Sequence, residues 1–430
     1  MKRCSARASL ILMAVLLTGG WGAGWCQNRT IEEPQQVAAG TWKLVQADGI
    51  APGAWVGKAV LRSTGSDGGS WTPELVLRIL NRDRGMLVDI PSQRMFSYPI
   101  DTFTLSRDRL TFLLDAAGPG QELAFTGTFS SSFRQQGSAV TGGIVGTIQA
   151  ASWRGSFYLQ RAVEPKAPGE IAVDLPVGRQ SEAVFLPGTL TIPGETDTFT
   201  PEKGLDEPLL VLVSGSGKAD RNGNNRDVPG RNDVLALLAR EMRNRGVATL
   251  RYDRRGTGEA YLLEKPGTST SIDTHAHDLA RILELGRQWV GGGRLLVAGM
   301  HEGAWIAAAA LRSFKYPDEI VDGFAVLDSS GEPPMEALDS SLMALGNELH
   351  ALGMQAARNL VAGQPLPALP EVLADFFAPS RLTWLASWLA FDPVRDIADC
   401  GVPVLFVRGT EDMQVSEDQF ARLCAARPSA

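Results

Sequence analysis

The sequence has little that would hold a metal ion or attract nucleic acid. Its four histidines and four cysteines are scattered over 430 residues, and no group of them has the short spacing of metal-ligand motifs. A formal net charge of −7 makes the surface mildly acidic, which attracts neither nucleic acid nor an anionic membrane. We therefore expect no metal, no cofactor and no nucleic-acid partner.

A long hydrophobic run is also missing. The apolar run at residues 10–17 is shorter than the roughly 20 residues that span a bilayer. A basic start precedes it and small residues follow it, so we interpret residues 1–25 as a cleaved secretory signal and expect an exported protein, periplasmic or extracellular, with no integral membrane span. Cys26 would allow a lipid anchor, but Trp25 fits a lipoprotein processing site poorly, so we expect none.

Export would place the remaining cysteines in an oxidising compartment. Cys400 and Cys424 flank the last expected strand. Two interpretations are open: the two thiols pair, or Cys400 is a small buried residue with no covalent partner.

The length and a change of pattern along the chain predict two domains. Residues 38–162 carry short alternating apolar runs, separated by turn residues such as Asp83-Arg84-Gly85 and Gly142-Gly143. This pattern is typical of hairpins in a small β barrel or sandwich. Residues 163–180 are rich in Pro, Gly and charge, which indicates a linker. The β-rich domain contains no cluster of titratable residues, so a binding module and a purely structural appendage are both open.

Residues 181–430 alternate apolar strands with amphipathic helices. Strands that are apolar throughout are buried on both faces, so the fold class is α/β, with a doubly wound, mostly parallel sheet. Residues 332–390 interrupt the alternation with a helical insertion that has the position of a lid. Its aromatic residues would line or pack a pocket; they are Phe376, Phe377, Trp384 and Trp388.

A glycine-bracketed turn joins one strand to an alanine-rich helix. The stretch Gly299-Met300-His301-Glu302-Gly303 has the layout of a nucleophile elbow, Gly-x-Ser-x-Gly, in which a sharp turn exposes a serine hydroxyl. In this chain His301 occupies the serine position. The sequence therefore predicts the backbone turn of a hydrolytic site, with histidine in place of the serine nucleophile.

The order of these segments resembles the α/β-hydrolase fold, and in particular exported bacterial hydrolases that join a β-rich domain to a serine-hydrolase domain. The resemblance covers about residues 38–424 and rests on four stretches, which are "VLVSGSGKADRNGNN", "LRYDRRGTGEA", "VAGMHEGA" and "VPVLFVRGTEDMQVS". It implies hydrolysis of carboxylic esters or, in some relatives, of peptide amides. The implied ligand is a small acyl ester or a peptide-like molecule.

The resemblance also implies roles for particular residues. Gly215, Ser216 and Gly217 match the oxyanion loop, which with the backbone amide of Glu302 would stabilise the charge of a tetrahedral intermediate. Asp412 matches the catalytic acid that orients a histidine. A carboxylate that caps the turn is the alternative for Asp412.

Bracing roles are expected for two charged segments of the same domain. Asp220 and Arg221 follow the oxyanion loop, and the run 253–255, Asp-Arg-Arg, ends a strand. We expect both segments to hold loops in place by ion pairing and not to react.

Two of the three triad functions are missing at their expected places. His301 replaces the nucleophile, and the histidine that follows Asp412 in the family would fall beyond Ala430, together with the last strand. We therefore expect an esterase-like protein with impaired activity and an exposed edge on the preceding strand. Such a protein either drifts without selection or is kept as a pseudoenzyme that binds a ligand or partner. A longer, active form of the protein is one alternative. A site rebuilt around His301 is the other, with candidate groups at Ser214, Ser216, His275, His277, Asp328, Ser329 and Ser330.

Overall fold

The computed structural model describes residues 42–65, 68–81, 84–115, 122–135, 138–178, 184–194, 198–215, 217–226, 228–265, 269–412 and 414–427. The expected signal at 1–25, Cys26 and Ser216 lie outside the described residues. The chain divides into two units. The β-rich unit comprises Gln35–Ala167 and Asn224–Asn232, and the α/β unit comprises Pro168–Gly223 and Asp233–Ala430.

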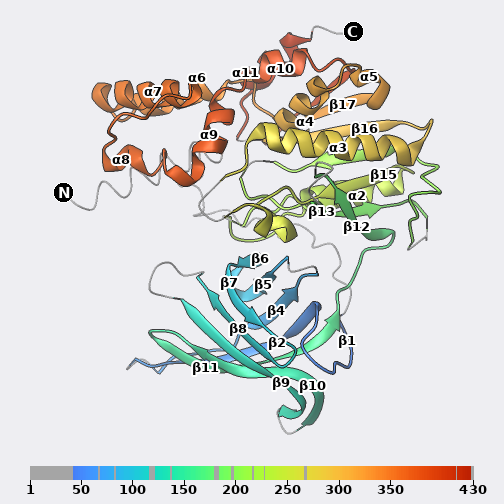
Figure 1. Ribbon diagram of the computed structural model, residues 1–430, viewed down its shortest axis with the longest axis vertical. Coiled ribbons are helices and arrows are strands. Elements are labelled where there is room, and N and C mark those ends of the chain that lie inside the picture. The colour runs from blue at the N-terminus through green and yellow to red at the C-terminus, as the bar shows by residue number, and fades with distance from the viewer. Residues whose placement is uncertain are drawn as a thin grey trace. The chain divides into compact units, whose positions relative to one another are not determined.

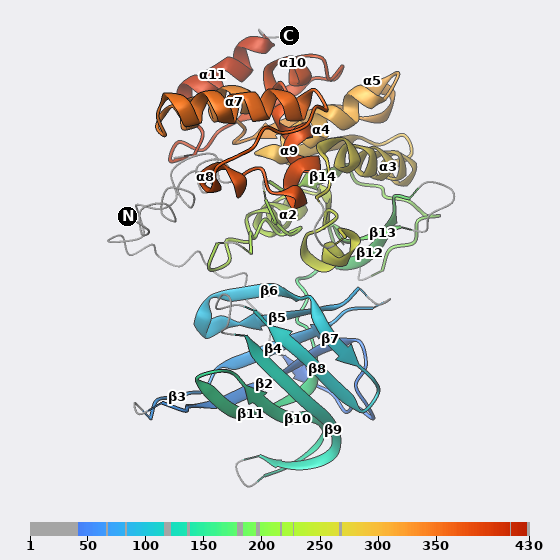
Figure 2. The ribbon, with the colours of Figure 1, turned by 60° about the vertical axis from the view of Figure 1, so that its left-hand side comes forward.

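The β-rich unit is one antiparallel sheet with the strand order β6-β5-β4-β2-β11-β10-β9-β8-β7, to which β1 and β3 add at β11 and β2. The sheet curls around its own core (Figure 2), so it is closer to a barrel than to a two-sheet sandwich. Phe112 and Phe125 face each other on β8 and β9 and stack with ring centroids 4.3 Å apart. The strands are β1 Lys43–Leu44, β2 Gly53–Ser63, β3 Ser70–Trp71, β4 Glu74–Ile79, β5 Met86–Ile90, β6 Met95–Ile100, β7 Thr102–Leu105, β8 Arg109–Leu114, β9 Leu123–Gln135, β10 Ser138–Gln149 and β11 Trp153–Val163, with a short 3-10 helix η1 at Pro91–Gln93.

The α/β unit contains a seven-stranded sheet with the order β12-β13-β15-β14-β16-β17-β18. The pairs β12–β13 and β13–β15 are antiparallel and the others are parallel. This is the predicted doubly wound, mostly parallel sheet. The strands are β12 Glu170–Pro176, β13 Phe185–Thr191, β14 Leu209–Val213, β15 Ala248–Tyr252, β16 Leu295–Met300, β17 Gly323–Leu327 and β18 Val404–Val407.

Strand β12 lies inside the segment that we predicted as a linker at 163–180. It pairs with β13 over its whole length, and Leu175 is fully buried in the core of the α/β unit. The proline and glycine content suggested a linker, but an edge strand tolerates proline, and Pro176 ends this one.

Helices cover both faces of the sheet (Figure 1). Successive residues of a strand point to opposite faces, and on β14 Val211 packs with the helices α3 and α4 while Leu212 packs with α2. Both faces are apolar because both are covered. The helices are α2 Val234–Asn244, η2 Gly258–Leu263, α3 Ile272–Val290, α4 Glu302–Ser313 and α5 Pro317–Ile320.

The predicted helical lid is present between β17 and β18 and is the group of helices around α7 in Figure 1. Of its four expected aromatics, Phe376, Phe377 and Trp388 are buried in the core and Trp384 is half-buried against it. These side chains pack the insertion onto the unit. The remaining helices are α6 Pro334–Met343, α7 Asn347–Val361, α8 Glu371–Ala374, η3 Pro379–Arg381, α9 Leu382–Leu389, α10 Pro393–Ala398 and α11 Glu417–Ala426.

Candidate active site

The turn between β16 and α4 has the backbone of a nucleophile elbow. His301 has φ 50° and ψ −120°, a conformation that is strained for a residue with a side chain. A Cβ atom on Gly299 would lie 2.4 Å from the backbone of Ala304, and one on Gly303 would lie 2.5 Å from the Val213 carbonyl oxygen. The two glycines are therefore required because backbone segments approach closely at this turn.

The imidazole of His301 lies against the oxyanion loop. A Cβ atom on Gly215 would be 3.3 Å from the His301 Cδ2 atom. The His301 backbone is held by the Leu327 carbonyl, which accepts from its N–H at 3.0 Å, and by the Ser329 hydroxyl, which donates to its carbonyl at 3.0 Å. The strained turn thus presents an imidazole beside the loop that would receive an oxyanion.

The Arg254 side chain forms hydrogen bonds with the predicted oxyanion loop. Its buried guanidinium donates to the Gly215 carbonyl at 2.5 Å, to the Gly217 carbonyl at 3.2 Å and to the Ser214 hydroxyl at 3.3 Å. Burial lowers the pKa of Arg254, and the nearby Glu302 carboxylate opposes that shift. The sequence predicted that the 253–255 segment braces a loop. In the structure Arg254 does so by donating to the carbonyls of the loop.

Glu302 contributes more than its backbone amide. As the first residue of α4 its N–H has no acceptor inside the helix, which suits an oxyanion donor. Glu302 is only 5% exposed. Burial raises the pKa of its carboxyl group to about 7, and the charge of the nearby Arg254 guanidinium opposes that shift.

Asp412 caps the turn after β18. Its Oδ1 atom accepts the backbone N–H groups of Gln414 at 2.7 Å and Val415 at 3.2 Å. Its Oδ2 atom is buried and has no hydrogen-bond partner among the described residues. The alternative capping role is therefore present, and the atom that would orient a histidine is unpartnered within the described chain.

The other histidines do not reach Asp412 within the part of the chain that the structure describes. His275 is buried in the first turn of α3 with an unpartnered Nδ1 atom, and its pKa is lowered well below the usual value by burial and by the charges of Arg254 and its neighbours. His277 is exposed, and His350 bonds to Asp339 at 2.8 Å.

The hydroxyls near His301 are engaged by backbone groups. Ser214 donates to the Ala219 carbonyl at 3.3 Å, Ser329 donates to the His301 carbonyl, and Ser330 accepts the Glu332 N–H at 3.0 Å. Asp328, beside them, accepts the Gly409 N–H at 2.6 Å. None of these hydrogen bonds brings a hydroxyl to the imidazole.

The charged residues after the loop form ion pairs and hydrogen bonds, and one ion pair joins the two predicted segments, Arg221 with Asp253 at 3.5 Å. Asp253 accepts the N–H groups of Arg221 at 2.7 Å and Glu259 at 2.9 Å, and burial raises its pKa to about 6. The side chain of Arg221 pairs with Glu259, and Arg255 pairs with Asp278 on α3 at 2.6 Å. The three charged residues of the 253–255 run therefore contact different parts of the unit: Asp253 contacts η2, Arg254 the loop after β14, and Arg255 helix α3.

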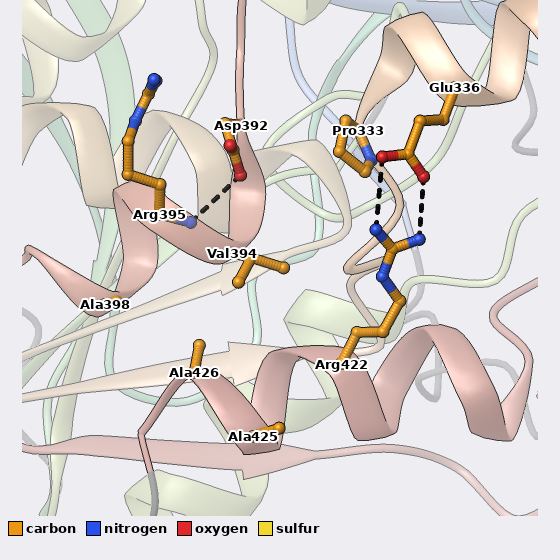
Figure 3. Close-up of a pocket in the computed structure, with 9 residues that line it drawn as sticks. All are labelled: Pro333, Glu336, Asp392, Val394, Arg395, Ala398, Arg422, Ala425 and Ala426. Carbon is orange, nitrogen blue, oxygen red and sulfur yellow. Dashed lines mark hydrogen bonds and ion pairs between the residues drawn. The ribbon is translucent and has the colours of Figure 1, made fainter.

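A hollow of about 520 Å³ lies in the α/β unit between α6, α10 and α11 (Figure 3). Its walls include the Arg422–Glu336 ion pair at 2.9 Å. No predicted site residue lines it.

Three further observations concern the described residues only. Cys400 and Cys424 are both free thiols, and burial raises the pKa of Cys400, so the second interpretation of Cys400 applies. No described group of His, Cys, Asp or Glu side chains is arranged to hold a metal ion. No described helix combines the length and apolar character needed to cross a bilayer.

An elbow at the end of a central parallel strand, an oxyanion loop after the neighbouring strand and an acid after the seventh strand define the α/β-hydrolase class. Residues 210–430, from β14 onward, match the model of the alpha/beta hydrolase family. The match covers half of the chain, so the chain belongs to the alpha/beta hydrolase family.

Solved structures similar to this chain include several hydrolases. An alpha/beta hydrolase from Penicillium sp. sh18 is 13% identical, with 59% of this chain and 85% of that chain covered and a TM-score of 0.37. An esterase from Pyrococcus furiosus is 15% identical, with 61% and 79% covered and a TM-score of 0.37. A proline iminopeptidase from Mycobacterium smegmatis is 16% identical, with 60% and 87% covered and a TM-score of 0.36. No curated protein matches the chain.

Proposed function

We propose that the α/β unit binds a small carboxylic ester, carboxylate or peptide-like ligand at the elbow and is impaired in hydrolysing it. The observation that carries the proposal is His301, an imidazole on an otherwise intact elbow with φ 50° and ψ −120°. A serine hydrolase needs a hydroxyl, a base and an orienting acid in one hydrogen-bonded line. The elbow supplies no hydroxyl, and the Asp412 Oδ2 atom has no partner in the described chain.

Backbone N–H groups at the elbow support the binding of such a ligand. The Glu302 N–H begins a helix, and Gly215 lies directly beside the His301 ring. Such amides stabilise the partial negative charge of a carbonyl or carboxylate oxygen even where no covalent step follows. The ligand would therefore be small and would present an oxygen to the elbow.

Turnover of short-chain 4-nitrophenyl esters tests the impairment. We expect the purified protein to match its His301→Ala variant in rate, because an imidazole without an orienting acid gives only slow background hydrolysis. His350→Ala is the matched control, since it removes an imidazole that bonds to Asp339 and is not a candidate for the rebuilt site. Turnover that disappears in His301→Ala and survives in His350→Ala would establish the alternative, an active hydrolase with a rebuilt site.

Calorimetric titration with a short-chain carboxylate tests the binding role. Gly215→Ala places a methyl group 3.3 Å from the His301 ring and is expected to weaken saturable binding. Gly292→Ala is the control because nothing lies within 4 Å of its new methyl group. Equal affinity in the two variants would place the ligand away from the elbow.

We also propose that the protein is exported, on the composition of residues 1–25. Cell fractionation of the full chain tests this, with the expected signal in the periplasm or medium. Recovery only from the cytoplasm would contradict it.

A further inference from the structure

The chain leaves the α/β unit shortly after the predicted oxyanion loop. Gly223 is the last residue of the α/β unit before this departure and Asp233 is the first residue after the return, while Asn224–Asn232 belong to the β-rich unit. The stretch that contains Gly215 and Gly217 stays within the α/β unit. A segment of the β-rich unit is therefore directly continuous in sequence with the loop beside the elbow.

The two ends of this segment are held close together. The Asn222 carbonyl accepts the N–H of Leu235, in the first turn of α2, at 3.0 Å. The buried Asn224 side chain accepts the Asn232 N–H at 2.8 Å. A loop whose ends are closed in this way is an Ω-type loop, and such loops are frequently functional.

The segment binds the hairpin that β5 and β6 form in the β-rich unit. The Gly230 N–H donates to the Arg94 carbonyl at 2.8 Å, and the Arg231 guanidinium lies over the Phe96 ring, 5.5 Å from its centroid. Gly230 has φ 102°, and a Cβ atom there would lie 2.9 Å from the Arg94 Nη2 atom. The contact thus combines a backbone hydrogen bond, a cation–π pair and a glycine that permits close approach.

The hairpin that receives the segment has a strained backbone, which buried groups hold in place. Arg94 and Ser97 have φ 54° and 50°, values that residues with a side chain seldom adopt. The Ser97 N–H donates to the buried Asp89 Oδ1 atom at 2.7 Å, and Asp89 pairs with Arg78 at 2.8 Å. Strain of this kind persists only where the surrounding structure over-determines it, and it gathers at functional sites. The hairpin is therefore shaped for docking.

The turn that leads from the oxyanion loop to the segment has little slack. Asp220 accepts the Asn222 N–H with its carboxylate and the Gly223 N–H with its carbonyl, both at 2.9 Å. Asp253 anchors this turn on the α/β unit by accepting the Arg221 N–H at 2.7 Å. The docked segment is a second anchor for the same short stretch of chain. Loss of the second anchor would let the stretch pivot about Asp253.

We propose that the β-rich unit is a docking module for this chain's own segment Asn224–Asn232, and that binding of the segment positions the oxyanion loop. Arg231 and Phe96 are in this sense positioning residues. The proposal gives the β-rich unit a binding role in place of a purely structural one. It goes beyond ligand binding at the elbow, and it does not depend on which ligand binds there.

Hydrogen exchange measured by mass spectrometry on the full chain tests the coupling. Two peptides are followed, one covering residues 214–223 and one covering residues 224–232. Phe96→Leu removes the ring that Arg231 faces but keeps an apolar side chain, and Arg231→Ala removes the cation. Because an exposed cation–π pair changes an equilibrium by roughly two- to fivefold, we expect each variant to speed exchange in both peptides by that factor.

Two control variants separate docking from general loosening. Phe103→Leu removes a half-buried ring that packs against the core of the β-rich unit. Arg245→Ala removes an exposed arginine that pairs with Glu241 on α2. Neither change touches the pair of Arg231 and Phe96, so both should leave exchange in the 214–223 peptide unchanged.

A double variant tests whether the two positioning residues act through one contact. Phe96→Leu combined with Arg231→Ala should speed exchange no more than either single change. The proposal is overturned if the single variants speed only the 224–232 peptide, if Phe103→Leu speeds the 214–223 peptide equally, or if the two changes add. If Phe96→Leu does not fold, Arg231→Ala decides the question by itself, because Arg231 is exposed.

Discussion

Individual charged residues determine the chemistry that this elbow can support. Arg254 and Glu302 are both buried, and Arg254 donates to the Gly215 carbonyl. Buried charges are stable only when they are paired and hydrogen-bonded, and each of these two charges opposes the pKa shift that burial gives the other. Arg254 therefore fixes the position of Gly215 beside the His301 imidazole.

His301→Ser is expected to leave the protein inactive on 4-nitrophenyl butyrate. The change restores a hydroxyl at the elbow, but no described histidine bonds to Asp412 to act as its base. Initial rates should stay at background, with an unchanged circular dichroism spectrum as the folding control. A fast esterase produced by this one substitution would refute the reasoning.

Glu302→Gln is expected to flatten the dependence of stability on pH. Because burial raises the pKa of Glu302 to about 7, its contribution to stability is fully present below pH 4.5 and is lost as the pH rises through 7. The loss between pH 5 and pH 8 should be on the order of 3 kcal/mol in the free energy of unfolding. Urea unfolding of wild type and variant measures it, with the exposed Glu336→Gln as control. Parallel pH curves for wild type and Glu302→Gln would contradict the assignment.

At the scale of elements, the elbow depends on how closely α4 approaches the sheet. Gly303 lies against the carbonyls of Val213 and Ser214, at the end of β14. The helix can begin directly after β16 only because this position has no side chain. The close approach of the two backbones therefore explains the glycine at position 303.

Gly303→Ala is therefore expected to destabilise the α/β unit. The new methyl group would lie 2.5 Å from a backbone oxygen, and overpacking of this kind costs about 1–3 kcal/mol. Gly292→Ala serves as the control because its methyl group meets open space. Chemical unfolding of both variants checks the prediction; equal midpoints would show that α4 can shift away from β14 at no cost.

At the scale of the whole molecule, β18 is an edge strand of the α/β sheet among the described residues. β18 is last in the strand order, and Leu405 and Val407 on it are 63% and 42% exposed. An unpaired apolar edge offers backbone groups to another chain. β18 itself, Val-Leu-Phe-Val, carries no charged side chain that would oppose such pairing.

We expect the protein to self-associate through β18. Leu405→Lys adds a charge to the strand and should lower the apparent mass in sedimentation experiments over a range of protein concentrations. Val361→Lys is the control, because Val361 is 41% exposed on α7, away from the sheet edge. A wild-type protein that stays monomeric at every concentration would count against this edge as an interface.

Much of the fold was predictable because its signals are local. Fully apolar strands such as β14 predicted a sheet covered on both faces, and the segment order predicted the α/β-hydrolase class, which is confirmed. The exception was β12, since proline and glycine near an edge strand resemble a linker when the partner strand is unknown. The predicted site roles of Gly215, Ser216, Gly217 and Asp412 remain proposals, and Ser216 lies outside the described residues.

By itself, the sequence determined the alternation of strands and helices, the glycine-bracketed turn at residues 299–303 and the histidine on it, because each depends on near neighbours in the chain. Only the tertiary structure decided what the buried polar groups contact. The Arg254 guanidinium donates to the Gly215 carbonyl, and the Ser329 hydroxyl donates to the His301 carbonyl. Such partners come from segments far apart in the chain, and only the packing of those segments brings the donor and acceptor together.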